Sequence, residues 1–323
     1  MKLLVTGGAG YIGSVVAAQL VEDGHEVVIL DDLSTGHADA VPRGASLVAA
    51  DLRSGARPVL ATGIDAVLHF AAKSLVAESV AEPARYWDNN LGQTIALLDA
   101  MRAAGVSRIV FSSTASVYGQ PESVPIPETA PPRPVNPYGA TKLAVDTTLA
   151  EYARLHGFGA VSLRYFNVAG AYRERGGRWL GERHGTETHL IPNVLAIALS
   201  GSGELSMFGD DYPTPDGTCI RDYIHVADLA RAHLLALDAI KPGSHQIYNL
   251  GNGDGYSNRQ VIDAVREVTG RPVPVKVAPR RPGDAAATVA ASDKARRELG
   301  WRPARPNLHD IIADAWSFHQ SAW

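Results

Sequence analysis

Tyr138 and Lys142 stand four residues apart in the segment from Pro137 to Leu143, which carries no other charged residue. Proline is typical of the first turn of a helix, and residues i and i+4 share one helix face, so the phenol and the ammonium would be neighbours. A nearby cation lowers the pKa of a phenol below its usual value of about 10. We therefore expect Tyr138 to exchange a proton with a substrate hydroxyl. The alternative is that the pair lies on the exposed side of an ordinary surface helix.

Three hydroxyl side chains stand upstream of this pair. Ser112, Ser113 and Thr114 directly follow the apolar run from Ile109 to Phe111, which reads as a buried strand. Ligands of open α/β sheets bind at the carboxyl ends of the strands. The hydroxyl groups are therefore expected beside Tyr138, where they can contact a reacting oxygen.

A glycine-rich segment, Thr6 to Gly13, directly follows the short apolar strand expected from Lys2 to Val5. Glycines at 8, 10 and 13 match the dinucleotide-binding fingerprint, and those at 7, 10 and 13 match a wider-spaced variant. Glycine lets the backbone turn sharply and approach a pyrophosphate at the start of the next helix. The segment therefore predicts a dinucleotide site.

Asp31 supports this interpretation. Ile12, Val15, Val16 and Leu20 follow helical spacing, Gly24 ends the helix, and a second strand is expected over Val27 to Leu30. An acidic residue at the tip of that strand can accept hydrogen bonds from a ribose 2′-hydroxyl and repels a 2′-phosphate. The position of Asp31 favours NAD over NADP, although Asp31 or Asp32 alone would also suit a turn.

Further strands are expected over 47–50, 66–70, 108–112 and 161–165, with helical segments between them. This alternation predicts an α/β fold with a Rossmann-type doubly wound parallel sheet. The pattern breaks near Gly170. We expect residues 1–170 to form the NAD-binding domain, with strands at 222–226 and 246–250 returning to its sheet as part of 221–250. Residues 171–220 and 251–323 would form a second, smaller α/β substrate-binding domain, with the ligand in the cleft.

The composition limits the function classes. Of 323 residues, 46% are hydrophobic and 20% charged, and the net charge is -4. These values favour a soluble globular protein and give no electrostatic support for nucleic acid or an anionic membrane as partner. A single cysteine, Cys219, excludes an intramolecular disulfide framework and any cysteine-rich metal site. We expect no metal, no signal peptide, no membrane span and a cytoplasmic location.

Taken together, the glycine motif, the hydroxyls at 113 and 114 and the Tyr138–Lys142 pair resemble the extended short-chain dehydrogenase/reductase superfamily. Within it, the runs from His69 to Ala72, from Tyr165 to Asn167, and above all from Phe208 to His225 resemble the UDP-glucose 4-epimerase family. The similarity extends from Lys2 to Trp316.

The resemblance implies a tightly held NAD and interconversion of UDP-galactose and UDP-glucose through a 4-keto sugar. Tyr138, Lys142, Thr114 and Ser113 would be the catalytic residues. The implied cofactor contacts are Gly7, Gly10, Tyr11, Ile12, Gly13, Asp31, Asp51, Leu52, Phe70, Ala71, Ala72, Asn89, Ser112, Tyr138, Lys142 and Tyr165. The implied UDP-sugar contacts are Thr114, Tyr138, Asn167, His189, Leu190, Arg221, Arg281, Asp284 and Thr288. A homodimer is a further implication of the family.

This chain departs from the family pattern at three positions. Ser74 follows Lys73 where some members carry a lysine, and His189 replaces an asparagine, so that the uracil contact would pass through Leu190. Thr288 stands where some members have a bulky aromatic residue, and we hypothesise that it admits N-acetylated sugars.

Other functions remain open. A nucleotide-sugar 4,6-dehydratase shares the first oxidation but needs an added acid and base, usually an Asp-Glu pair after the strand-end hydroxyl, where this chain has Ala115 and Ser116. A decarboxylase or a uronate epimerase also fits the fold. A non-catalytic NAD-binding regulator would keep the glycines without needing Tyr138 and Lys142.

Overall fold

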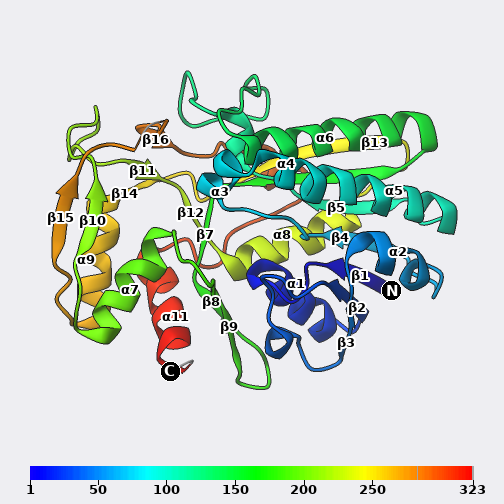
Figure 1. Ribbon diagram of the computed structural model, residues 1–323, viewed down its shortest axis with the longest axis horizontal. Helices are drawn as coiled ribbons and strands as arrows, with labels where there is room; N and C mark the ends of the chain where they lie inside the picture. The colour runs from blue at the N-terminus through cyan, green and yellow to red at the C-terminus, as the bar shows by residue number, and fades with distance from the viewer. Residues whose placement is uncertain (282, 322–323) are drawn as a thin grey trace.

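A parallel sheet of seven strands forms the centre of the protein (Figure 1), in a computed structural model that describes residues 1–281 and 283–321. The strand order is β13-β6-β5-β4-β1-β2-β3, and every neighbouring pair is parallel. The predicted doubly wound α/β fold is therefore confirmed. The strands are β1 (Lys2–Thr6), β2 (Glu26–Asp31), β3 (Ala45–Ala49), β4 (Ala66–His69), β5 (Arg108–Ser112), β6 (Gly159–Tyr165) and β13 (Ser244–Leu250).

Helices cover both faces of this sheet, because successive strand residues point to opposite sides. Leu3 and Val5 pack with α1 (Tyr11–Glu22) and α8 (Val226–Asp238), whereas Leu4 packs with the helices of the other face. Those helices are α2 (Leu52–Leu60), α5 (Gln93–Ala104) and α6 (Pro137–His156). The central strands β1, β4 and β5 are buried on both sides and are accordingly rich in apolar residues, whereas the edge strand β3 is only partly buried.

Short helical segments connect these elements around the carboxyl edge of the sheet. They are α3 (Val76–Ala81), α4 (Pro83–Tyr86), a π-helical turn at Trp87–Gly92 that leads into α5, and 3-10 turns at Ala38–Ala40 and Ala115–Tyr118. The helix expected from Asn89 to Ala104 is thus present, but its first turn is π-helical.

A second group of elements packs around its own core beside the sheet (Figure 1), with Val194, Val261, Ile311 and Trp316 among the buried residues. Its helices are α7 (Leu190–Ser200), α9 (Asn258–Thr269) and α11 (Leu308–Ser321), whereas α10 (Asp293–Glu298) packs on the core of the main sheet and contacts β13. The short strands are β7 (Asn167–Ala169), β8 (Ala171–Arg173), β9 (Trp179–Gly181), β10 (Leu205–Phe208), β11 (Ile220–Arg221), β12 (Tyr223–His225), β14 (Tyr256–Ser257), β15 (Val275–Ala278) and β16 (Ala287–Thr288).

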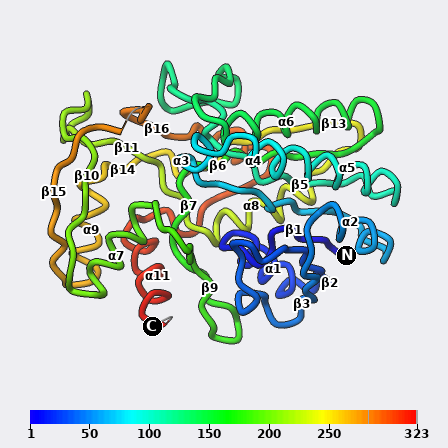
Figure 2. The backbone as a smooth tube through the Cα atoms, viewed as in Figure 1, coloured from blue at the N-terminus to red at the C-terminus, as the bar shows by residue number. Residues whose placement is uncertain are grey.

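Figure 2 shows how the chain returns to the sheet: the yellow segment with α8 and β13 lies among the blue-to-green elements. The prediction for 246–250 is confirmed, because β13 pairs with β6. The prediction for 222–226 was wrong, because β12 pairs with β7 outside the main sheet. The buried carboxylate of Asp222 explains the difference: it accepts hydrogen bonds from the backbone N–H groups of Asn252, Gly253 and Ala290 and so ties this segment to other loops.

None of the helices within residues 1–281 and 283–321 combines the length and the apolar character that crossing a membrane requires.

Candidate functional site

Helix α6 begins beside the loop that follows β5. Pro137 occupies its first turn, and the side chain of Asn136 accepts a hydrogen bond from Gly139 N at 2.8 Å. Gly139 packs so closely on this loop that an added Cβ would lie 2.5 Å from Ser116 O. This close approach brings Tyr138, on the first turn, within hydrogen-bonding reach of Thr114, which is buried at the end of β5.

The pKa of Tyr138 differs from the expectation. Burial raises this pKa above its usual value, and the hydrogen bond with Thr114 lowers it only in part. The prediction of a pKa lowered by Lys142 was therefore wrong for the protein alone. Lys142 is also buried, and its ammonium group points to the backbone of β5 rather than to the phenol.

Lys142 lies against the end of β5. Its Nζ donates to the carbonyl oxygen of Ser112 at 2.8 Å and stands 4.8 Å from the centroid of the Phe111 ring. Burial lowers its pKa to about 7, although the carboxylate of Asp146 opposes this change. An ammonium has three donors, so this contact leaves two N–H groups for hydroxyl oxygens of a ligand.

The hydroxyls of Ser112 and Ser113 have partners other than Tyr138. The Ser112 hydroxyl pairs with the hydroxyl of Tyr165, and Ser113 Oγ donates to Asp146 Oδ2 at 3.2 Å. Asp146 also forms a buried ion pair with Arg164 at 2.9 Å. Sequence analysis missed Asp146 and Arg164, although Asp146 stands one helical turn after Lys142 on the same face.

The glycine segment lets helix α1 start close to the sheet. Gly7 has φ +70, and an added Cβ would lie 2.5 Å from Ala71 N. A Cβ on Gly13 would lie 2.2 Å from Gly7 O, whereas Gly10 is the N-cap of α1 and leaves more room. Within the part of the chain described, this N-cap makes no side-chain hydrogen bond, and the first turn carries no acidic residue. Its free N–H groups fit a diphosphate at the carboxyl edge of the sheet.

The carboxylate of Asp31 lies beside this turn. Its two oxygens accept hydrogen bonds from Ala9 N and Leu33 N, both at 2.9 Å, and burial raises its pKa. Each carboxylate oxygen has a second lone pair. A ribose with two free hydroxyls can therefore donate hydrogen bonds to this carboxylate. A phosphate at the same place would be repelled by its negative charge.

The other expected cofactor contacts line the same edge. Phe70, Ala71 and Ala72 follow β4, and Phe70 packs against His233 with ring centroids 4.8 Å apart. Asp51 is the N-cap of α2 and accepts a hydrogen bond from Ser54 N at 2.8 Å. Helix capping therefore also explains an aspartate at this position. Leu52 is buried, and Ile12 packs partly buried against the core. Tyr11 donates to Gly170 O at 2.7 Å.

Asn90, rather than Asn89, organises the loop after β4. Asn90 is buried, and its amide binds the backbone N and O of Lys73 at 2.8 and 3.0 Å. Asn89 is partly buried, and its amide contacts Asn90 and Gln93. The sequence did not indicate the π-helical turn, and nothing in it distinguished Asn89 from its neighbour Asn90.

Three of the expected substrate residues come together across two short strands. Arg221 on β11 is the register partner of Thr288 on β16, and its guanidinium lies 3.7 Å from Asp284. Exposed Arg281 stacks on the ring of Phe208, with 3.9 Å from its guanidinium carbon to the ring centroid. These positions leave cationic groups beside the small β11–β16 sheet.

Asn167, His189 and Leu190 lie on other elements. Asn167 opens β7 and is partly buried, while its N–H donates to Asp222 O at 2.9 Å. Leu190 is the first residue of α7, and His189 is its N-cap. The His189 imidazole binds Glu182 and Glu187 at 2.8 and 3.0 Å. Burial opposes the charged imidazole, but these carboxylates raise its pKa to about 10.

Comparisons with known proteins agree along the whole chain. The model of the NAD dependent epimerase/dehydratase family matches residues 3–251. The chain is 57% identical to a UDP-glucose 4-epimerase of Streptomyces lividans, covering 99% of this chain and 96% of the relative. It is 55% identical to the Corynebacterium glutamicum UDP-glucose 4-epimerase, covering 98% and 95%. The structure of a Stenotrophomonas maltophila UDP-glucose 4-epimerase with bound NAD and formylated UDP-arabinopyranose aligns with a TM-score of 0.93 at 43% identity, covering 100% and 98%.

Proposed function

Because the chain belongs to the NAD dependent epimerase/dehydratase family, we propose that it is a nucleotide-sugar 4-epimerase that interconverts UDP-galactose and UDP-glucose. The similarity to UDP-glucose 4-epimerases at 55–57% identity covers nearly the entire chain and supports this activity over others of the family. The contact between Tyr138 and Thr114 at the carboxyl end of β5 carries the proposal, because it joins a proton-transfer group to a second hydroxyl.

NAD is the cofactor, and its binding would involve the free N-terminal N–H groups of α1, the carboxylate of Asp31 and the ammonium of Lys142. When bound, NAD supplies a reversible hydride acceptor and a positive ring. The ring charge would lower the pKa of Tyr138, which the protein alone raises.

In the proposed reaction, Tyr138 removes the proton of the 4-hydroxyl of the sugar while the C4 hydrogen leaves as a hydride, for which NAD would be first the acceptor and, on the return step, the donor. Thr114 holds the reacting oxygen and contacts the phenol from the end of β5. Lys142 holds the cofactor ribose through the two N–H groups that Ser112 does not use. Ser113 acts through Asp146, which it contacts, and is a positioning residue. After the 4-keto sugar turns over, Tyr138 returns its proton to the same oxygen.

The nucleotide of the substrate would be held by Arg221 and Arg281 from the second group of elements, with Asp284 and Thr288 beside them. Guanidinium groups suit a diphosphate because they donate two parallel hydrogen bonds. Asn167, His189 and Leu190 would complete this site at β7 and the start of α7. Binding through the nucleotide leaves the sugar free to rotate. We propose residues 171–220 and 251–323 as the substrate-binding part, to which Asn167 and Arg221 would be added from outside these ranges.

The proposal also includes a homodimer in the cytoplasm. Val80, Trp87 and Ile95 are exposed large hydrophobic residues on consecutive helical segments from α3 to α5. An apolar strip of this kind suits contact with a second copy of the chain. Sedimentation of the purified protein tests the dimer, and a monomer at all concentrations would contradict it.

A 4,6-dehydratase has less support. The residues after Thr114 are Ala115 and Ser116, and the backbone N–H of Ser116 donates to the Thr114 side chain at 3.1 Å. Neither residue supplies the acid and base that elimination of water requires.

The deciding experiment is incubation of the purified protein with UDP-galactose and no added cofactor, followed by chromatographic resolution of the products. We expect UDP-glucose and no 4-keto-6-deoxy sugar. Separate incubations with UDP-glucuronate and with UDP-GlcNAc test for uronate epimerase or decarboxylase activity and for epimerisation of N-acetylated sugars. Protein that is purified without NAD, or that needs a large excess of it, would argue for an ordinary dehydrogenase.

A further inference from the structure

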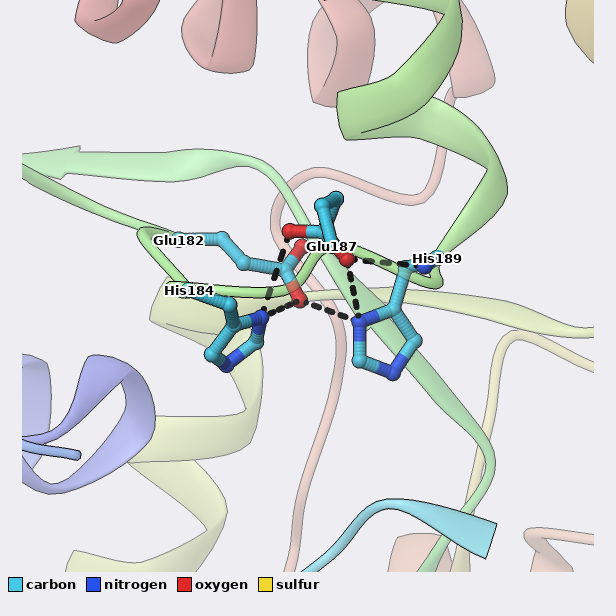
Figure 3. Close-up of side chains that lie close together, drawn as sticks. All are labelled: Glu182, His184, Glu187 and His189. Atoms are coloured by element: carbon cyan, nitrogen blue, oxygen red, sulfur yellow. Dashed lines mark hydrogen bonds and ion pairs between the residues drawn. The ribbon is translucent and has the colours of Figure 1, made fainter. Parts of the chain in front are cut away.

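Four side chains converge in the segment that links β9 to α7. Glu182, His184, Glu187 and His189 each offer one ligand atom, and these atoms lie within 4.8 Å of one another. Figure 3 shows both imidazoles turned toward the two carboxylates, with Nδ1 as the inward-facing nitrogen of each ring. His184 Nδ1 lies 3.5 Å from Glu182 and 3.2 Å from Glu187, and His189 Nδ1 lies 2.8 and 3.0 Å from the same residues.

The cluster concentrates negative charge in a partly buried place. The two carboxylates contribute a charge of -2, of which a protonated His189 imidazole offsets one unit, and a metal ion would take the place of that proton. The side chain of Glu182 is only 8% exposed, and that of Glu187 is 20% exposed. The neighbouring cation does not neutralise them, because Arg183 forms its ion pair with Asp39 at 2.5 Å. Buried carboxylates of this kind are held by a cation or a metal ion.

We infer that Glu182, His184, Glu187 and His189 form a binding site for a divalent transition-metal ion, with Zn²⁺ as the best match. Two imidazole nitrogens and two carboxylate oxygens are a donor set that Zn²⁺ accepts in tetrahedral geometry. Ligands about 2.0–2.1 Å from Zn²⁺ stand roughly 3.3 Å from one another. The four N–O distances, from 2.8 to 3.5 Å, bracket this value.

The metal site fixes the junction between the two parts of the protein. Glu182 directly follows β9, and His189 is the N-cap of α7. Within the described residues, the His189 side chain forms no capping hydrogen bond with this helix. Both carboxylates also act electrostatically on Tyr11, at the start of α1. An ion here ties the start of α7, where Leu190 is expected to meet the nucleotide, to the end of β9, which contacts helix α1 of the cofactor-binding part. Binding of the metal itself does not depend on the proposed epimerase activity.

The test is zinc binding by the full chain, freed of any purification tag, stripped with a chelator and dialysed. Competition with a chromophoric chelator should give one Zn²⁺ per chain, and Mg²⁺ and Ca²⁺ should not compete. His184→Ala and Glu187→Gln should each weaken binding by about tenfold or more, since even residues that only support metal ligands contribute this much. Zinc should raise the unfolding temperature of the wild type and have a smaller effect on both variants.

His309→Ala is the matched control. It removes an exposed histidine that pairs with one glutamate, Glu267, at 2.8 Å. One histidine and one carboxylate do not supply the four ligands of the proposed site. This variant should bind Zn²⁺ like the wild type. Circular dichroism checks folding, and Glu187→Gln, which keeps the side-chain shape, guards against a misfolded His184→Ala. Absence of saturable binding by the wild type, equal affinity of wild type and both cluster variants, or equally tight Mg²⁺ binding would each overturn the inference.

Discussion

The ammonium of Lys142 donates to the main-chain carbonyl oxygen of Ser112 at 2.8 Å and stands over the ring of Phe111. The residue is 3% exposed, so the cation is held at the carboxyl end of β5 with little solvent around it. Its orientation is therefore fixed before a ligand arrives, and the remaining N–H groups define where ribose hydroxyls can bind.

Replacing Lys142 with Met should lower the rate of UDP-galactose conversion by on the order of a hundredfold, because the cofactor ribose would lose the ammonium that orients it beside Tyr138. Retained NAD should also fall. Lys294→Met is the matched control, because Lys294 donates to Ile247 O at 2.8 Å and stands 4.7 Å from the Tyr248 ring centroid. Equal activity of the two variants would contradict the role of Lys142.

Tyr138→Phe should reduce the rate by about a hundredfold or more while NAD stays bound, as expected when a proton-transfer group is lost. The absorbance of bound cofactor and the initial rate measure the two effects separately. Tyr152→Phe controls for loss of a hydroxyl on the same helix, since Tyr152 donates to Asp99 at 2.9 Å far along α6. An active Tyr138→Phe enzyme would remove the central assignment.

Local sequence determines much of this site. Gly13 was predictable because an added Cβ would collide with the backbone of Gly7 within the same strand-turn-helix unit, and Gly7 because its φ of +70 favours glycine in the turn itself. The start of α6 was predictable from Pro137 for a similar reason, since the signal lies within one helical turn.

Long-range contacts explain the predictions that failed. The strand at 222–226 was misplaced because Asp222 bonds to residues 30 to 68 positions away in the chain. Ser113 was expected beside the substrate, but its hydroxyl donates to Asp146 on α6, which is itself paired with Arg164 on β6. The cluster that includes Glu182 was missed for a different reason: its four members lie within eight consecutive residues, but their spacing follows no recognised metal motif and did not indicate that the side chains converge.

Thr288→Tyr should lower turnover of UDP-GlcNAc relative to UDP-galactose by about tenfold, because overfilling a packed site typically costs 1–3 kcal/mol. Thr288 lies opposite Arg221 on the β11–β16 pair, where a larger side chain would narrow the sugar site. Thr288→Ser should keep the wild-type ratio. Wild-type protein with no more than background activity toward UDP-GlcNAc would refute the underlying hypothesis.

The stability of the protein should depend on pH through His69. His69 is buried between Thr6 and Thr94, whose hydroxyls lie 2.6 and 2.8 Å from its ring nitrogens. Burial lowers its pKa from 6.5 to about 3. Between these values the unfolded chain binds the proton and the folded protein does not, so the free energy of unfolding falls as the pH falls from 6.5.

Urea unfolding of the wild type and His69→Gln at several pH values measures this contribution. His69→Gln should be less stable at pH 7, because it loses buried hydrogen bonds, but its stability should fall less between about pH 6.5 and 4.5. The difference in slope should be at most about 1.4 kcal/mol per pH unit, the value for one proton. Since His309 is exposed, His309→Gln should keep the wild-type slope. Parallel curves for the wild type and His69→Gln would mean that His69 is protonated in the folded protein or that its burial does not persist in solution.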